Sequence, residues 1–247
     1  MQDKVFEEVN QLSDCEWIIT CEHAGALIPE EYNSLGVSAE NLDTHIARDK
    51  GAREVARRLA QKLNCYAILG KYSRLLVDLN RRSDEKELIV SSSDKVIIPA
   101  NQNLDEKERD KRLNLYYYPY YQALERQISH VKSLGKKPLI FSVHSFTPQL
   151  KGGNFRPWNA GILWNKPNKL SDFVYHELSQ NVNKKIGANV PYDLQKYSTG
   201  AVIICGEEKG YDYGLIEIRD SEFDDLTSGA EWWAANLAGI LQKFSKK

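Results

Sequence analysis

The 247-residue sequence lacks the features that mark secreted, membrane-spanning and cysteine-rich metal proteins. Its cysteines are Cys15, Cys21, Cys65 and Cys205. Because no two of them have CxxC spacing, the pattern indicates neither a disulfide framework nor a cysteine-type zinc cluster. No stretch approaches the roughly 20 apolar residues of a membrane span, and the first residues carry acids where a signal peptide is apolar. We therefore expect a soluble cytoplasmic protein without a membrane partner.

An excess of positive charge is also missing. The 33 lysines and arginines nearly balance the 34 aspartates and glutamates, and they are not gathered into a long basic run. A nucleic-acid partner is therefore not expected. The sequence has no internal repeat and no Gly/Ser/Pro-rich linker. With 42% hydrophobic residues, it suits a single domain over residues 1–247.

Several motifs of common enzyme classes are absent. There is no GxSxG elbow, which disfavours a serine hydrolase, and no GxxxxGK[ST] or GxGxxG loop for a nucleotide. The pair His176-Glu177 is followed at the relevant position by Gln180, so the HExxH signal of zincins is missing as well.

What is present is an alternation of short apolar runs with helical segments. This alternation predicts a three-layer α/β/α sandwich with a mixed sheet. The expected strands are residues 16–21, 65–69, 74–82, 138–142 and 213–220. The expected helices are residues 38–63, 105–134 with a kink or a division at Pro119, 170–186 and 229–244.

Two histidines follow predicted strands. His23 comes after the strand at 16–21, and His144 comes after the strand at 138–142, in a loop that leaves through a Thr-Pro turn. Open α/β sheets bind ligands at the carboxyl ends of such strands. A satisfied structural histidine is nevertheless the more common finding at any one such position. Each histidine alone therefore indicates little.

Charged residues at other predicted strands strengthen the case for a site. Asn80 and Arg81 suit a substrate carboxylate, because a guanidinium group binds a carboxylate in a bidentate manner. Glu217 and Arg219 interrupt an apolar strand, which is costly unless they are paired or used. Together with the two histidines, Glu217 completes a set sufficient for a hydrolytic metal site with a carboxylate base.

A further pair is ambiguous. His45 and Asp49 lie four residues apart in the predicted helix 38–63 and would share one face. The simpler interpretation of this spacing is a surface His–Asp contact.

The sequence resembles the N-formylglutamate amidohydrolases through an ordered set of segments that spans nearly the whole chain. These segments are Cys21-Glu22-His23-Ala24-Gly25 with Ile28-Pro29, Leu42 to Asp49 with Gly51-Ala52, Ser73-Arg74-Leu75 to Arg81, Pro119-Tyr120, His144 to Pro148, Arg156-Pro157-Trp158 and Glu217-Ile218-Arg219. The same skeleton looks like that of the zinc carboxypeptidase and aspartoacylase group.

The resemblance implies one zinc ion bound by His23 and His144. The third ligand is open between Glu22 and His45, because the glutamate that aspartoacylase-like sites place three residues after the first histidine is Ala26 here. We favour His45, since related sequences carry Asp or His at that place.

The resemblance further implies a role for most of the remaining charged residues. Glu217 would be the general base, and Asn80 with Arg81 would hold the substrate carboxylate. Arg74 or Arg156 would stabilise the oxyanion, and Arg156 and Arg219 would also contact the substrate.

The expected substrate is a small N-acyl amino acid, such as N-formylglutamate, which would place the enzyme in amino-acid catabolism and histidine degradation. Two alternatives remain at this level. One is a zinc carboxypeptidase or aminoacylase acting on another substrate, and the other is a non-catalytic protein that binds acidic metabolites. Cys205 favours the second alternative, because we expect related sequences to carry a histidine there, and its loss would be consistent with a loss of catalysis.

Overall fold

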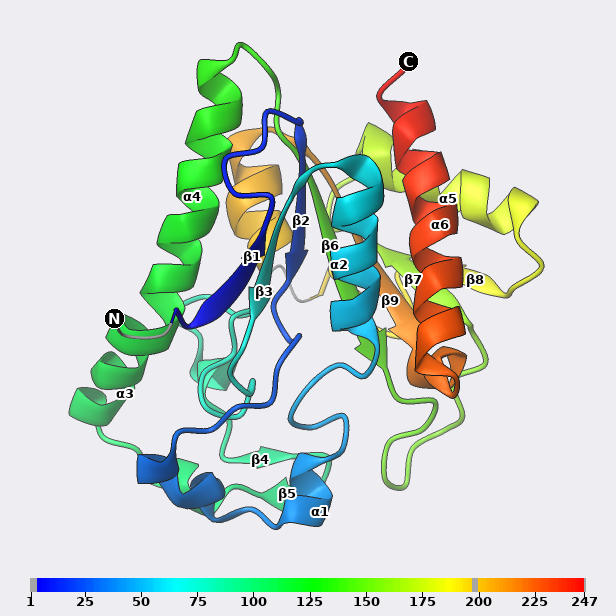
Figure 1. Ribbon diagram of the computed structural model, residues 1–247. Helices are drawn as coiled ribbons and strands as arrows, with labels where there is room; N and C mark the ends of the chain where they lie inside the picture. The colour runs from blue at the N-terminus through cyan, green and yellow to red at the C-terminus, as the bar shows by residue number, and fades with distance from the viewer. Residues whose placement is uncertain (1–3, 197–199, 247) are drawn as a thin grey trace.

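The computed structural model describes residues 4–196 and 200–246. At its centre lies a seven-stranded sheet in the order β1-β3-β2-β6-β9-β7-β8 (Figure 1). Its strands are β1 Phe6–Val9, β2 Trp17–Cys21, β3 Tyr66–Gly70, β6 Leu139–Phe146, β7 Ala160–Leu163, β8 Ile186–Ala188 and β9 Asp212–Arg219. β1 runs antiparallel to β3 and β7 antiparallel to β9, and the other neighbours are parallel. The sheet is therefore mixed, as predicted.

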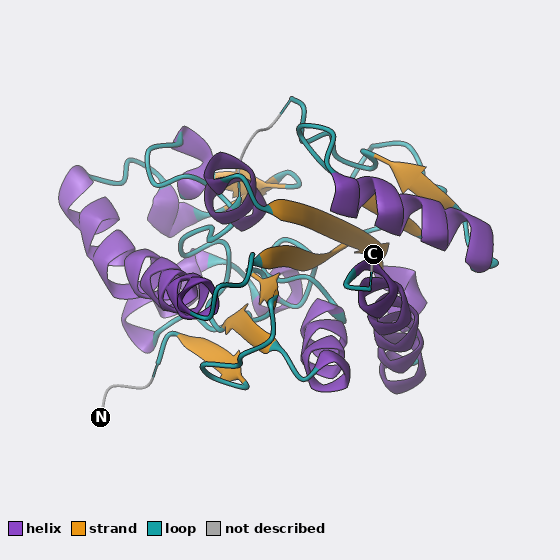
Figure 2. Cartoon of the chain, turned by 90° about the horizontal axis from the view of Figure 1, so that it is seen from above, coloured by secondary structure: helices purple, strands orange, loops and turns teal. Residues whose placement is uncertain are grey.

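Helices cover both faces of the sheet (Figure 2). They are α1 Ala39–Leu42, α2 Ala52–Leu63, α3 Glu106–Arg112, α4 Tyr118–Ser133, α5 Lys169–Asn181 and α6 Leu226–Phe244. Residues of α2, α5 and α6 share one hydrophobic cluster, and residues of α4 belong to another on the opposite face. A small hairpin of β4 Ser92–Ser93 and β5 Val96–Ile97 lies apart from the main sheet. The three-layer arrangement confirms the predicted fold class.

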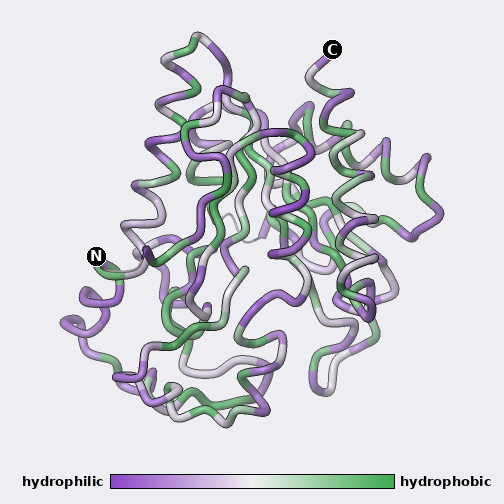
Figure 3. The backbone as a smooth tube through the Cα atoms, viewed as in Figure 1, coloured by the Kyte–Doolittle hydropathy of each residue, from purple (hydrophilic) through white to green (hydrophobic). Residues whose placement is uncertain are grey.

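Side chains of the central strands alternate between the two clusters. In β2, Trp17, Ile19 and Cys21 pack toward α2 and α6, whereas Ile18 packs into the cluster that contains α4. This two-residue period follows from the pleat of a strand, and burial on both faces explains why the run is continuously apolar. The hydropathy colouring shows the same contrast between hydrophobic central strands and the hydrophilic outer turns of the helices (Figure 3).

The predicted helix over residues 38–63 is wrong in its middle. Two helices are present instead, and turns separate α1 from α2. Asp49 is held in that intervening segment because its backbone N–H donates to the carbonyl of His23, 3.0 Å away. Gly51 then begins α2 with a positive φ of 78° and packs against Phe223, where a Cβ would approach the ring to 2.3 Å. His45 and Asp49 therefore do not share a helical face.

The predicted strand at residues 74–82 is also wrong, since this segment forms turns. The carboxylate of Asp78 accepts from the backbone N–H of Asn80 at 2.8 Å, and Arg74 lies on the same carboxylate at 3.3 Å. These local hydrogen bonds compete with pairing in a sheet. Conversely, β6 is longer than predicted and reaches Phe146, so His144 lies within the strand rather than in a loop after it.

The helix predicted over residues 105–134 is present, but its irregularity is a π-helical segment before Pro119 and not a division at that residue. α3 ends at Arg112, the π-helical segment Leu113–Tyr117 follows, and α4 has Pro119 in its first turn. No helix in the described part of the chain has the length and apolarity needed to cross a membrane.

Candidate metal centre and active site

Two histidines and an aspartate converge at the carboxyl ends of β2 and β6. His23 follows β2, His144 lies near the end of β6, and Asp49 is in the turn before α2. Each offers one ligand atom within 4.8 Å of the others, and all three residues are buried. The two imidazole rings are edge to face with their centroids 4.9 Å apart. Two neutral imidazoles and a carboxylate are a common donor set for a divalent metal ion.

A further carboxylate lies close to the outer nitrogen of each imidazole ring. His23 Nε2 is 2.6 Å from Asp78 Oδ1, and His144 Nε2 is 2.9 Å from Glu22 Oε2. The second contact is close, but its direction is not that of a hydrogen bond. On the inner side, His144 Nδ1 is 2.8 Å from Asp49 Oδ2, and His23 Nδ1 is 3.5 Å from the same atom without a hydrogen bond. Carboxylates that orient metal-binding histidines from behind are typical of zinc sites.

Hydrogen bonds connect the segments that carry this group. Besides bonding to the carbonyl of His23, Asp49 accepts from the backbone N–H of Ser145 at 3.2 Å. The Ser145 hydroxyl donates to the carbonyl of Lys50 at 2.7 Å. The Asp49 turn is therefore fixed to both strand ends, and this holds its carboxylate between the two rings.

Electrostatics at the centre favours a cation. Although burial alone lowers the pKa of His144, its contacts with Asp49 and Glu22 raise that pKa well above the usual value. Burial raises the pKa of Asp49, but the neighbouring His23 and His144 more than offset this and lower it. For Asp78, His23 and Arg74 likewise outweigh the effect of burial. The negative charges of Asp49 and Glu22, which raise the pKa of His144, also attract a metal cation.

Glu217 is a carboxylate that lines the cavity beside this group. It lies in β9 directly across the ladder from His144, and one of its oxygens has no hydrogen-bond partner among the described residues. Burial, opposed by His144 and reinforced by the charge of Asp49, raises the pKa of Glu217 to about 7. A carboxyl group with such a pKa can both accept and return a proton near neutral pH.

A cavity of about 360 Å³ opens beside Glu217. The charged and polar residues that line it include the predicted His23, Arg74, Asn80 and Arg81. Tyrosine hydroxyls of α4 and of the π-helical segment before it fix the 79–81 turn, because Tyr117 donates to the carbonyl of Arg81 and Tyr121 to that of Leu79.

The wall behind Asn80 depends on a glycine. Gly200 has a φ of 93°, and a Cβ at that position would lie 2.0 Å from the Asn80 side-chain oxygen. Only a glycine combines this backbone conformation with so close an approach.

Other predicted site residues lie outside this cavity lining. His45 is beside Asp94 at 3.3 Å and is not part of the His23–Asp49–His144 group. Glu22 lies behind His144, where it accepts from the Ser142 hydroxyl at 2.8 Å.

Two of the predicted substrate-binding arginines do not themselves line the cavity, although Arg156 contacts the lining residue Tyr192. The Arg156 guanidinium stacks over the Tyr192 ring at 5.0 Å. Arg219 donates to the Ser221 hydroxyl at 2.9 Å and lies 3.7 Å from Glu222.

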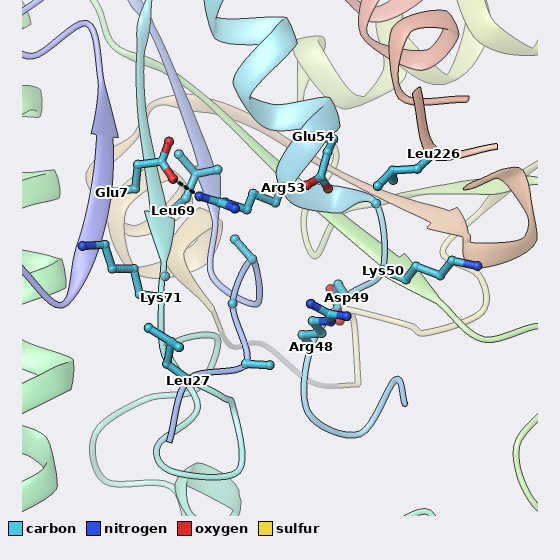
Figure 4. Close-up of a pocket in the computed structure, with 15 residues that line it drawn as sticks. Glu7, Leu27, Arg48, Asp49, Lys50, Arg53, Glu54, Leu69, Lys71 and Leu226 are labelled. Carbon is cyan, nitrogen blue, oxygen red and sulfur yellow. Dashed lines mark hydrogen bonds and ion pairs between the residues drawn. The ribbon is translucent and has the colours of Figure 1, made fainter. Parts of the chain in front are cut away.

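A larger cavity of about 530 Å³ lies on the other side of the Asp49 turn (Figure 4). Lys71 and Leu27 lie on one side of it, and Lys50 and Leu226 lie on the opposite side. Its lining includes neither histidine of the metal group and does not include Glu217. The smaller cavity is therefore the better candidate for catalysis despite its size.

Cys205 has no direct place in the site. It is buried in the π-helical segment Val202–Gly206, and its sulfur lies 3.6 Å from a carboxylate oxygen of Glu125. Burial raises the pKa of this thiol, with a further contribution from Glu125, so the group stays neutral. It does not belong to the lining of the smaller cavity.

Sequence reasoning missed the roles of Asp49 and Asp78. The spacing of His45 and Asp49 suggested a surface contact, whereas Asp49 is 4% exposed and bonds to His144. Asp78 was visible only as one polar residue in an expected strand. A usable signal existed in its sequence context, since an acid among apolar residues is costly to bury without a partner.

Together, the fold and the site define a mixed α/β protein with a candidate metal centre at the edge of a cavity. A model of the N-formylglutamate amidohydrolase family matches residues 15–223, and the chain belongs to that family. As a member of it, the protein is an amidohydrolase. A search of curated proteins finds no match.

Solved structures agree with this assignment at the level of the fold. The structure of a gene product from Agrobacterium tumefaciens has a TM-score of 0.92 and 29% identity, and the match covers 98% of this chain and 94% of that one. N-formylglutamate amidohydrolase from Ralstonia eutropha has a TM-score of 0.70 and 18% identity, with 98% and 99% of the two chains covered. The second likeness, at such low identity, supports the fold alone.

Proposed function

We propose that this protein is a zinc-dependent amidohydrolase that removes the acyl group from an N-acyl amino acid. The simplest substrate is an N-formyl amino acid such as N-formylglutamate, in line with the family. The observation that carries this proposal is the buried His23–Asp49–His144 group beside Glu217, at the edge of a cavity that also contains Arg81.

The donor set fits a single zinc ion. His23, Asp49 and His144 would hold it, and Asp78 and Glu22 would orient the two imidazoles. Asp49 replaces His45 in our assignment because it lies between the two rings. When bound, zinc would supply an activated water and polarise the substrate carbonyl.

The chain's own residues would carry the remaining steps. Glu217, with its raised pKa, would take a proton from the attacking water and return it to the leaving nitrogen. Arg74 would contribute positive charge near the developing oxyanion, since it lines the cavity within 3.5 Å of Asp49 and 3.3 Å of Asp78. Asn80 and Arg81 would hold the substrate carboxylate. Direct contacts of Arg156 and Arg219 with substrate stay predictions.

The test begins with metal content and hydrolysis. The purified protein should retain about one zinc per chain and release free amino acid from N-formyl substrates. A chelator should abolish turnover, and added zinc should restore it. Parallel assays with acetylated and short-peptide substrates separate this function from an aminoacylase or a carboxypeptidase. A protein that binds no metal and cleaves none of these compounds would contradict the proposal.

The variant Glu217→Gln separates the general base from the metal centre. It should lower kcat by about 10²–10⁴-fold while the zinc content stays the same, because the amide can neither accept nor return the proton. Full activity in this variant would remove Glu217 from the mechanism.

A further inference from the structure

Tyr192 lines the cavity that also contains Glu217 and Arg74. It lies in the segment that follows β8. The Arg156 guanidinium donates a hydrogen bond to the Tyr192 hydroxyl at 3.3 Å and stacks over its ring at 5.0 Å. Because a guanidinium group only donates, the phenol oxygen is the acceptor in this contact. The phenol proton is left to be donated elsewhere, and no residue in the described part of the chain accepts it.

The backbone that carries Tyr192 is fixed beside Glu217. Gly161 of β7 lies directly across the ladder from Glu217. The Val190 carbonyl packs so closely on this glycine that a Cβ there would lie 1.6 Å from the oxygen. The N–H of Asn189 also donates to a carbonyl of β7 at 2.9 Å. Because Tyr192 comes two residues after Val190, these contacts keep it close to the strand position of Glu217.

Arg156 connects Tyr192 to the end of β6. Its guanidinium donates to the carbonyl of Thr147 at 3.3 Å, and Thr147 is the residue after β6, the strand that carries His144. The backbone N–H of Arg156 also donates to the carbonyl of Pro148 at 2.8 Å. Arg156 is therefore bonded to the loop after β6 at two points. Its contact with the phenol oxygen then limits the directions in which the hydroxyl can donate.

The charges that act on Tyr192 belong largely to groups proposed for the reaction. Partial burial raises the pKa of Tyr192, and the charge of Glu217 raises it further, whereas Arg156 and Arg74 partly offset the rise. The phenol thus keeps its proton near neutral pH. Glu217 would transfer the proton and Arg74 would stabilise the oxyanion. Tyr192 is therefore placed with the acyl group of a substrate rather than with its carboxylate.

We propose that the Tyr192 hydroxyl contacts the substrate and donates a hydrogen bond to the acyl oxygen, and that Arg156 is a positioning residue that acts through Tyr192. The inference rests on the proposed function. A neutral donor at this oxygen stabilises the negative charge that develops there in the transition state. No proton leaves Tyr192 in this step. Arg74 would act on the same oxygen through its charge, whereas Arg156 would fix the direction of the second donor.

The variant Tyr192→Phe removes the hydroxyl and keeps the ring. In the zinc-loaded protein with N-formylglutamate, kcat should fall by about tenfold or more and KM should change by less than about twofold, because the lost contact strengthens only in the transition state. The zinc content should equal that of the wild type. Tyr118→Phe is the matched control, since Tyr118 is also 39% exposed but lies outside this cavity lining, and it should leave both constants unchanged.

The variant Arg156→Gln tests whether the arginine acts through the phenol. It should lower kcat by about threefold or more in the wild type but by less than about twofold in the Tyr192→Phe background, where the contact is already lost. If Arg156 had a merely structural role, kcat would fall by the same factor in both backgrounds, and the positioning role would be overturned.

Three results for Tyr192→Phe would overturn the inference. An unchanged kcat would remove the hydroxyl from the reaction, and a raised KM with unchanged kcat would place it on the substrate carboxylate. Loss of zinc would show that the tyrosine supports the metal centre instead. All three leave the proposed function intact, because the wild-type protein still cleaves N-formylglutamate. Failure of the zinc-loaded wild-type protein to cleave any N-formyl compound would overturn the proposed function and this inference with it.

Discussion

The proposed active site has two parts that differ in construction. The first, here called the floor, is the buried group His23, Asp49, His144 and Glu217, and the second, the rim, includes the cavity-lining residues Arg81 and Asp193. Each floor residue is 7% exposed or less, whereas the Asp193 side chain is 29% exposed and lies on a loop. Strand ends and mutual hydrogen bonds hold the floor. In the proposed function, the reaction would depend on rigid elements, and loops that can vary more freely would contact the substrate.

The largest effect is expected when the carboxylate of Asp49 is removed from the floor. Asp49→Ala should abolish both zinc retention and turnover. It should also lower stability by about 3–5 kcal/mol, because it leaves His23, His144 and Arg74 without their shared carboxylate. Metal analysis, substrate assays and denaturant unfolding measure these three effects.

The control for Asp49→Ala is His45→Gln. This variant should keep about one zinc per chain, because His45 lies beside Asp94 and outside the metal group. If His45→Gln lost its zinc while Asp49→Ala kept it, the assignment of the third ligand would reverse.

A smaller effect on the floor is expected at Asp78. Asp78→Asn keeps the size of the side chain but weakens the contact that orients His23 at 2.6 Å. Zinc affinity should fall by about 10–100-fold, as for other residues that support metal ligands. Competition with a chelating dye measures the change, and an affinity equal to that of the wild type would show that Asp78 does not support the metal centre.

At the rim, Arg81→Ala should weaken binding of the substrate. Loss of a charge-assisted contact with the substrate carboxylate should raise KM by about 10–100-fold and leave kcat largely unchanged. The neighbouring Arg82 pairs with Glu208 at the surface, so Arg82→Ala is the control and should not alter KM. A large fall in kcat for Arg81→Ala would instead mean that Arg81 takes part in the reaction, as the floor residues are proposed to do.

The smallest effect is expected at Cys205, which belongs to neither part of the cavity. Cys205→Ala removes a buried thiol from the core, so stability should fall by about 1 kcal/mol while kcat/KM changes by less than about twofold. Equilibrium unfolding and steady-state kinetics test both statements. A pronounced loss of activity would mean that this segment influences the site more than its contacts indicate.

Site residues at or near strands could be predicted from the sequence, whereas those in turns could not. His23, His144 and Glu217 lie at or near strands whose apolar runs are recognisable, and the structure brings all three to one place. Asp49 escaped detection because its turn lies within residues 38–63, which were predicted as one helix. The 74–82 segment was predicted as a strand because it contains the apolar run Leu75-Leu76-Val77. These residues are buried, but local contacts with Asp78 hold the segment in turns.

The sequence alone determined the α/β class, the central strands and the family resemblance, because periodic burial and ordered motifs are local properties of the chain. Only the tertiary structure decided which carboxylate lies between the two histidines and which of the predicted arginines line the cavity. Those answers depend on residues as far apart in sequence as His23, Asp78 and His144. Their ionisation and partners arise from burial and proximity, which no local pattern specifies.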